Sequence, residues 1–148
     1  MKAQLTISVN CGKWLIVKAI LLMPQVKNAM HNGKIILKGG TTVSCIAEEL
    51  LGIKLRISGR ITNRGTVGCK NISNAPHSVL VEGGTWRNID ELFVEEALNL
   101  KENDIFVIGA NTIDIYGNSA MMAGSLEGGN PDRAISAMKI KNNFRRTS

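Results

Sequence analysis

The residues best suited to chemistry are a glycine pair followed by two hydroxyls: Gly39, Gly40, Thr41 and Thr42. They stand between an apolar run at 35–37 and a stretch at 43–51 with apolar residues at helical spacing. At the start of a helix, backbone N–H groups lack partners within the helix, and the helix dipole favours an anion. Glycine lets a ligand approach the backbone closely. These four residues are therefore predicted to bind a phosphate or carboxylate group.

A second polar group follows another apolar run, at 105–108. Asn111 comes shortly after Gly109, and Asp114 lies three residues further on. In open α/β sheets, ligands bind beyond the carboxyl ends of the strands. We therefore expect Asn111 and Asp114 to contact the ligand. Local hydrogen bonding in an Asx turn is the competing interpretation of both residues.

Two further charged residues are candidates. Asp104 comes directly before the apolar run at 105–108 and is a candidate functional acid, with turn formation as the alternative role. Lys13 lies in the first turn of an expected N-terminal helix, from which it could reach the anion. A surface lysine without a ligand is the alternative there.

Metal and cofactor chemistry has no support in the sequence. The histidines, His31 and His77, are isolated, and Cys11, Cys45 and Cys69 show no C-x-x-C spacing. The glycine turn matches neither a P-loop nor a dinucleotide fingerprint. We therefore predict no metal and no cofactor. The odd number of cysteines indicates a reduced, cytoplasmic protein.

The elements that must position these residues follow an alternating pattern. Strands are expected near 34–38, 53–61, 77–82 and 104–109, with helices at 11–22, 24–33, 43–51 and 90–100. Repeated strand–helix units predict right-handed crossovers and an α/β fold of three layers, a mainly parallel sheet with helices on both faces. We expect a single domain at 1–140 and a basic, poorly ordered tail at 141–148.

Charge is unevenly distributed along the chain, whose net charge is +6. Residues 1–47 hold six lysines and no acid, and residues 133–148 are also purely basic. This pattern indicates anion-attracting surfaces near the first third and the tail, with solvated lysine faces as the alternative. The apolar run at 14–23 is interrupted by Lys18 and is too short to span a membrane, so no membrane association is expected.

Together, the two glycine-containing segments resemble the superfamily of sugar-phosphate isomerases and CoA transferases. That superfamily includes ribose-5-phosphate isomerase, glucosamine-6-phosphate deaminase and the group of initiation factor 2B and methylthioribose-1-phosphate isomerase. Residues 39–42 with the helix after them look like its phosphate turn. Residues 104–113 look like its strand ending in V-G-A-D-x-I, with Gly117 and Asn118 as the downstream G-N pair. The resemblance covers about residues 10–130 and implies a sugar-phosphate ligand, with Gly117 and Asn118 among the ligand-binding residues.

More narrowly, the chain resembles uncharacterised prokaryotic proteins that share S-V-x-x-G-K-x-L-I near the start and G-T-T followed by A-E-E-L-L-G. Two departures from the superfamily matter. Asn111 stands where its pattern has the acid/base aspartate, and an amide cannot take up a proton near neutral pH. In the superfamily, further strands usually follow a second glycine-rich turn, which corresponds here to residues 128–131, so we expect a sheet truncated at its C-terminal end.

The sequence therefore predicts binding of a small phosphorylated metabolite, either a sugar phosphate or a nucleotide. If there is a reaction, the resemblance implies isomerase-like proton transfer with Asp114 or Asp104 as the acid. The first alternative is a non-catalytic ligand sensor or regulatory protein, which Asn111 favours. A weaker alternative is nucleic-acid binding through the basic tail, which lacks interleaved aromatic residues. A homo-oligomer is compatible with all of these functions.

Overall fold

The computed structural model describes residues 4–69, 74–122 and 129–136. The predicted basic tail at 141–148 lies outside these residues. The helices in the described part, apart from a helical segment at 129–136, are α1 (Val9–Leu22), α2 (Pro24–Asn32), α3 (Thr41–Leu51) and α4 (Phe93–Leu98). The strands are β1 (Lys34–Lys38), β2 (Gly59–Thr62), β3 (Gly65–Gly68), β4 (Ser78–Glu82), β5 (Thr85–Asn88), β6 (Ile105–Val107), β7 (Thr112–Ile113) and β8 (Ser119–Ala120).

The helices begin and end at residues whose chemistry explains the boundary. The hydroxyl of Ser8 accepts a hydrogen bond from Cys11 N at 3.2 Å and caps α1. Pro24 occupies the first turn of α2, where its missing N–H costs nothing. Gly52 ends α3 with a φ of 69°, the left-handed conformation that glycine readily adopts at a helix C-terminus.

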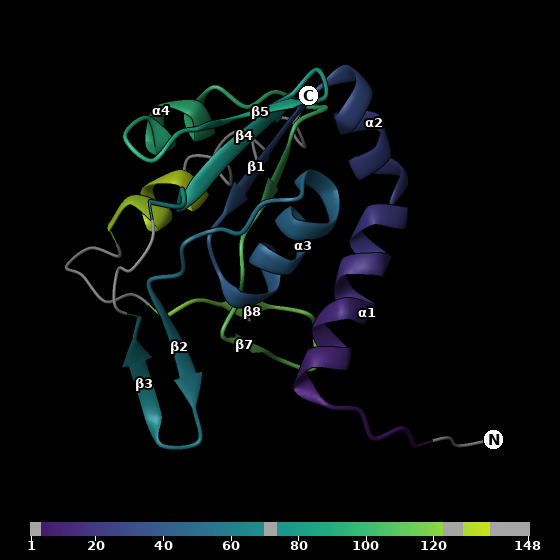
Figure 1. Cartoon of the computed structure of the whole chain (residues 1–148), viewed down its shortest axis with the longest axis vertical. Coiled ribbons are helices and arrows are strands. Elements are labelled where there is room, and N and C mark those ends of the chain that lie inside the picture. Colours follow the sequence, from purple (N-terminus) through teal and green to yellow (C-terminus); the bar gives the residue numbers. More distant parts are fainter. Residues whose placement is uncertain (1–3, 70–73, 123–128, 137–148) are drawn as a thin grey trace.

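The main sheet has the order β5-β4-β1-β6 (Figure 1). β1 pairs with β6 in parallel, with Leu37 opposite Val107. It pairs with β4 in the antiparallel sense, with Lys38 opposite Ser78, and β4 pairs with β5 in the same antiparallel sense. Two small hairpins, β2–β3 and β7–β8, form separate sheets.

The predicted three-layer, mainly parallel sheet is therefore wrong, because the main sheet is mostly antiparallel. One cause is the turn at Gly83 and Gly84, which directly follows the predicted strand at 77–82. Their φ values of 58° and 77° form a two-residue hairpin turn, so the chain returns directly as β5 rather than crossing over through a helix. The other cause is that β4 enters the sheet at the edge where β1 ends.

The predicted strand at 53–61 is also wrong, because most of it lies outside any sheet. Its last residues belong to β2, which pairs with β3 in a separate hairpin. Its earlier residues are hydrogen-bonded to α3 and to the segment before β4. Leu55 N donates to the Ser44 hydroxyl at 3.1 Å, and Arg56 N donates to the Pro76 carbonyl at 2.8 Å.

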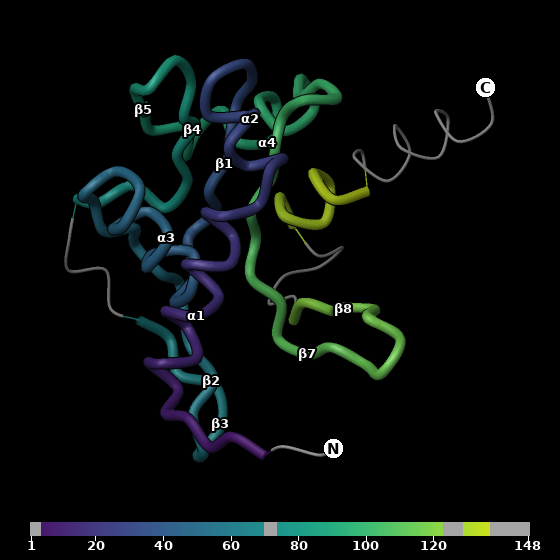
Figure 2. The backbone as a smooth tube through the Cα atoms, turned by 90° about the vertical axis from the view of Figure 1, so that its right-hand side faces the viewer, coloured from purple at the N-terminus to yellow at the C-terminus, as the bar shows by residue number. Residues whose placement is uncertain are grey.

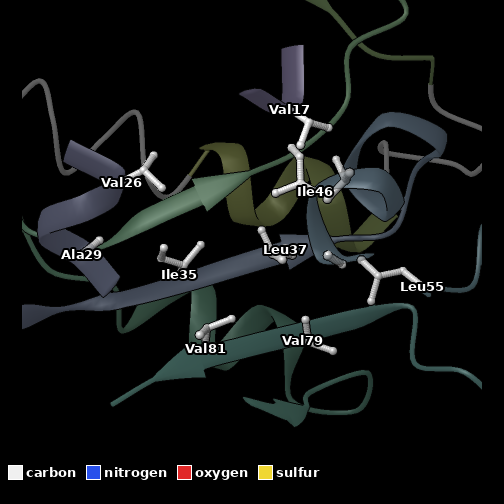
Figure 3. Close-up of a cluster of buried hydrophobic side chains, with 11 residues drawn as sticks. Val17, Val26, Ala29, Ile35, Leu37, Ile46, Leu55, Val79 and Val81 are labelled. Carbon is white, nitrogen blue, oxygen red and sulfur yellow. The ribbon is translucent and has the colours of Figure 1, made fainter. Parts of the chain in front are cut away.

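The core lies on both faces of the main sheet, because alternate strand residues point to opposite sides. Ile35 and Leu37 point to the face covered by α1, α2 and α3, where Figure 3 shows them with Val79 and Val81. Ile36 points to the other face, where the cluster also contains Leu80, Ile89, Phe93, Ala97, Leu100 and Ala134. Within the described residues, no helix is long and apolar enough to cross a membrane.

Candidate functional site at the end of β1

The glycine turn joins the end of β1 to the start of α3. Gly39 N donates to the His77 carbonyl at 2.6 Å, which holds the turn against the start of β4. Gly40 precedes α3 in an extended conformation, and α3 has no side-chain cap. The first amides of α3 are therefore left to solvent or to a ligand, as the sequence predicts for an anion site.

The two glycines have different structural roles. A Cβ at Gly39 would lie 2.6 Å from His77 Nδ1 and 2.7 Å from the His77 carbonyl oxygen, and would also overlap the Arg56 carbonyl. Gly39 is thus required for the close packing of three segments. A Cβ at Gly40 would meet nothing within 4 Å. The space beside the start of α3 is therefore open.

Lys38, the last residue of β1, was not identified from the sequence. It is only 9% exposed, and it points to the same side of the sheet as Ile36. Its Nζ lies 4.7 Å from the centroid of the Phe93 ring, a cation–π contact. Burial lowers the pKa of Lys38 below its ordinary value, and the nearby charge of Asp90 opposes this effect. The two-residue alternation from Ile36 was the signal that could have identified it.

At this end of the sheet, Asp90 is hydrogen-bonded to the start of β4 and to the Arg56 side chain. Its carboxylate accepts hydrogen bonds from the backbone N–H groups of His77 at 3.0 Å and Ser78 at 2.6 Å, and from Arg56 Nη2 at 3.2 Å. Burial alone would raise its pKa, but these hydrogen bonds and the charge of Arg56 lower it. We call Lys38, Arg56, His77 and Asp90 the polar cluster.

His77 completes the cluster as a neutral side chain. Its Nδ1 lies 2.7 Å from the Arg56 carbonyl oxygen, which can only accept, so Nδ1 carries the proton and donates. Burial lowers the pKa of His77, and the charges of Lys38 and Arg56 also lower it, against the opposing effects of the hydrogen bond to the Arg56 carbonyl and the charge of Asp90. The polar cluster at neutral pH therefore contains two cations and one anion.

The Lys38 ammonium is the member of the cluster with donors to spare. Among the described residues, no oxygen accepts a hydrogen bond from Nζ, while Asp90 is already engaged by three donor groups. Every fully buried side-chain nitrogen or oxygen in the described part has a partner, so Nζ itself must reach solvent. The arrangement thus presents a partly desolvated cation at a surface.

The segment that carries the predicted site residues Asn111 and Asp114 starts at the same end of the sheet. Because β1 and β6 are parallel and Leu37 pairs with Val107, both strands finish at the same end of the sheet. Residues after β6 then form the β7–β8 hairpin, which projects away from the main sheet (Figure 2). Asn111 lies in this hairpin, where its N–H donates to Ala120 and its Oδ1 accepts from Met122 N at 2.8 Å.

Asp114, Gly117 and Asn118 form the turn of this hairpin. The Asp114 carboxylate accepts from Tyr116 N at 2.9 Å and from Asn118 N and Nδ2 at 2.8 Å each. The hydrogen bond from the Asn118 side chain is the main cause of the lowered pKa of Asp114. Gly117 supports the turn with a φ of 85°. This is the Asx-turn geometry that the sequence left open, and the carboxylate is exposed and ionised.

Asp104 lies at the opposite end of the strand pair. Its carboxylate accepts from Lys34 N at 2.7 Å and from Lys101 N at 2.6 Å, so it joins the starts of β1 and β6. At roughly 3.3 Å per residue, the length of β1 separates it from the glycine turn by more than 10 Å. The structure therefore does not bring Asp104 together with Gly39–Thr42.

Lys13 is placed on the α3 side of α1. It stands one helical turn before Val17, which is wholly buried in a cluster with Val43 and Ile46 of α3. Lys13 is half-buried, and α3 begins with the open amides described above. Its predicted part in binding the anion is compatible with this position.

No group of three His, Cys, Asp or Glu side chains in the described ranges could hold a metal ion. Comparison of the chain with protein-family models, curated proteins and solved structures gives no match.

Proposed function

We propose that the chain binds a small phosphorylated metabolite at the end of β1, where the Lys38 ammonium and the first amides of α3 contact it from opposite faces of the sheet. The observation that carries this proposal is the state of Lys38: a nine-tenths buried cation whose ammonium has no hydrogen-bond acceptor in the described residues. A partly desolvated ammonium with free donors is stabilised by an anion that supplies oxygen acceptors.

The charge balance of the polar cluster supports the same ligand. Lys38 and Arg56 carry two positive charges against the one of Asp90, whose oxygens are already occupied. A phosphate monoester carries nearly two negative charges at neutral pH and offers three acceptor oxygens. Lys38 and Gly40 are two residues apart, at most about 7 Å along an extended chain. A sugar phosphate is long enough to contact both the ammonium and the α3 amides around the end of β1.

Binding without turnover is the form of this function that the geometry favours. Asp90 is held by hydrogen bonds, Asp114 is engaged within its own turn, and Asp104 lies at the far end of β1. Asn111 provides an amide where the resemblance implies an acid/base aspartate. We therefore propose a ligand sensor or regulatory protein as the second candidate function, ahead of an isomerase.

Calorimetry at neutral pH tests the binding proposal, with ribose 5-phosphate, glucosamine 6-phosphate and AMP as ligands. We expect saturable binding of at least one of them. Lys38→Met keeps the apolar stem of the side chain and should weaken binding at least about tenfold, because it removes a charge-assisted hydrogen bond. Thr41→Val with Thr42→Val should weaken it as well. Lys101→Met, at the opposite end of the sheet, is the matched control and should leave the affinity unchanged.

Two outcomes would contradict the proposal: no binding by any ligand of the panel, or equal affinities of Lys38→Met and wild type. The sensor form has its own test. The bound ligand is incubated with wild type and with Asn111→Asp, and the mixtures are followed by NMR. Binding with no product formed by wild type supports a sensor, whereas product formed by wild type would establish an enzyme.

A further inference from the structure

The two groups assigned to ligand binding lie on different faces of the main sheet. Lys38 points to the side of Ile36 and contacts the Phe93 ring. α3 packs on the opposite face, where Ile46 lies beside Leu37 (Figure 3). Each group is therefore expected to contact a different part of the ligand. The amides at the start of α3 are the donors suited to phosphate, because the helix dipole adds to their hydrogen bonds, which leaves Lys38 for the other end of the molecule.

The surroundings of Lys38 suit an imine better than an ammonium group. An ammonium carries three N–H donors, and no oxygen of the described residues accepts a hydrogen bond from Lys38 Nζ. The Phe93 ring, whose centroid lies 4.7 Å from Nζ, attracts positive charge but is a poor substitute for an oxygen acceptor. A protonated imine keeps the charge with a single N–H, and a neutral imine has none. Either form therefore leaves fewer donors unsatisfied at this position.

Lys38 is also activated as a nucleophile. Its side chain is nine-tenths buried, and Arg56 of the polar cluster places a second cation nearby. Burial and the charge of Arg56 both lower the pKa of Lys38, against the opposing charge of Asp90, so the amine form is more populated than in an exposed lysine. Desolvation and a neighbouring cation are the two features that activate lysines for reaction with carbonyl groups. Nζ still reaches solvent, and hence a ligand.

We propose that the Lys38 amine forms a Schiff base with the open-chain aldehyde or ketone of a phosphorylated sugar, whose phosphate lies on the first amides of α3. This inference rests on the proposed function and names its substrate class. The lone pair of Nζ attacks the carbonyl carbon, and the carbonyl oxygen takes up the proton that the nitrogen loses. The resulting carbinolamine loses water, made of its hydroxyl group and the remaining N–H proton, to leave a C=N bond. Solvent relays the protons, and hydrolysis returns the sugar unchanged, in accord with binding without turnover.

Reductive trapping of the wild-type protein tests this proposal. The matched ligands are ribose 5-phosphate, ribose and ribitol 5-phosphate, which offer aldehyde and phosphate, aldehyde alone and phosphate alone. Each is incubated with the protein and sodium cyanoborohydride at neutral pH, which reduces an imine to a stable secondary amine, and adducts are located by peptide mass spectrometry. Ribose 5-phosphate should label Lys38 at least about tenfold faster than ribose does, because the bound phosphate holds the aldehyde beside the amine. Ribitol 5-phosphate should leave no adduct.

The exposed Lys101 is the internal reference in the same sample, so the measurement does not depend on any variant. At neutral pH, ribose 5-phosphate should label Lys38 at least about tenfold faster than Lys101. The ratio of the two rates should fall as the pH rises toward about 9, because Lys101 gains more of its amine form over this range. Opening of the sugar ring affects both lysines equally and cancels in the ratio. Equal labelling of the two lysines, or a ratio that does not fall, would overturn the proposal.

Two variants separate this inference from the proposed function. Lys38→Arg keeps the positive charge but forms no imine, so it should lose the adduct at position 38 and still bind ribitol 5-phosphate in calorimetry. Thr41→Val with Thr42→Val should slow labelling of Lys38 by ribose 5-phosphate and leave labelling by ribose unchanged. Binding of both phosphates by wild type without an adduct at Lys38 would overturn the Schiff base and leave the proposed function standing. Equal labelling of Lys38 by ribose and ribose 5-phosphate, or no binding of either phosphate, would overturn both.

Discussion

Asp90 is the residue whose substitution tests the polar cluster most sharply. Its carboxylate joins β4 to the segment before β2, since it accepts from His77 N, Ser78 N and Arg56 Nη2. Asp90→Asn keeps the shape of the side chain but removes its charge and replaces one acceptor oxygen with a donor. The short hydrogen bond from Ser78 can be kept, whereas at least one other is lost.

The expected cost follows from these contacts. A hydrogen bond to a charged group contributes about 1.5–3 kcal/mol, and the carboxylate of Asp90 is only 26% exposed, so solvent screens it weakly. Loss of the Arg56 pair and of one hydrogen bond from a backbone N–H group should lower the free energy of unfolding by about 3 kcal/mol. For a chain of this length, that corresponds to a decrease in Tm of roughly 6–12 °C.

The effect should depend on pH in a defined direction. Because the folded-state pKa of Asp90 lies below its ordinary value of 3.8, the unfolded state binds more protons than the folded state in acid. The contribution of Asp90 is therefore complete above pH 5 and is lost as the pH falls through the folded-state pKa. The difference in stability between wild type and Asp90→Asn should shrink over the same range.

Urea denaturation of both proteins between about pH 3 and 7 measures this difference. Glu91→Gln, which removes a neighbouring exposed charge, is the matched control and should change the free energy of unfolding by less than about 0.5 kcal/mol. A cost for Asp90→Asn no larger than that of the control would refute the role assigned to Asp90. So would a cost that stays constant down to pH 3.

Three further predictions concern stability and are measured by the same denaturation experiment. Gly39→Ala should lower the free energy of unfolding by about 2–4 kcal/mol because the added Cβ has no room, whereas Gly40→Ala should lower it by less than about 1 kcal/mol. Equal losses of stability in the two variants would contradict the packing assigned to Gly39. Asp104→Asn should lower the free energy of unfolding by about 1.5–3 kcal/mol, since the Asp104 carboxylate accepts hydrogen bonds from two backbone N–H groups. Because these lie far from the glycine turn, ligand affinity should not change, and a weakened affinity would show that Asp104 belongs to the binding site. Lys38→Met should be at least as stable as wild type at pH 7, because the folded state disfavours the charged form of Lys38. As the pH rises toward 10, the free energy of unfolding of wild type should increase relative to that of Lys38→Met. A marked loss of stability in Lys38→Met at pH 7 would make Lys38 a structural residue.

The sequence predicts local elements well where one segment contains the whole signal. The apolar run of β1, the turn after it and the helix that follows are contiguous, and the structure confirms all three. Strand direction depends on partners that are distant in sequence. We expected a strand to end at residue 82, but the left-handed conformations of Gly83 and Gly84 make a hairpin, so β5 returns antiparallel to β4.

The polar cluster shows why the site was only partly predictable. Lys38, Arg56, His77 and Asp90 come from four separate segments, and no spacing between them suggests a common location. We predicted a helix from residue 90, but the Asp90 carboxylate accepts the backbone N–H groups of His77 and Ser78, and α4 begins only at Phe93. Asp114 and Asn118 were chosen through a resemblance, and the contacts described for them are those of a local turn.

The most direct test of the proposed function is a titration of the uniformly ¹⁵N-labelled protein with ribose 5-phosphate, followed by amide NMR. We predict saturable shifts at Gly40, Thr41 and Thr42, the open residues at the start of α3, and their loss in Lys38→Met. Saturable shifts confined to the β7–β8 turn, or an unchanged response in Lys38→Met, would contradict an anion site at the end of β1.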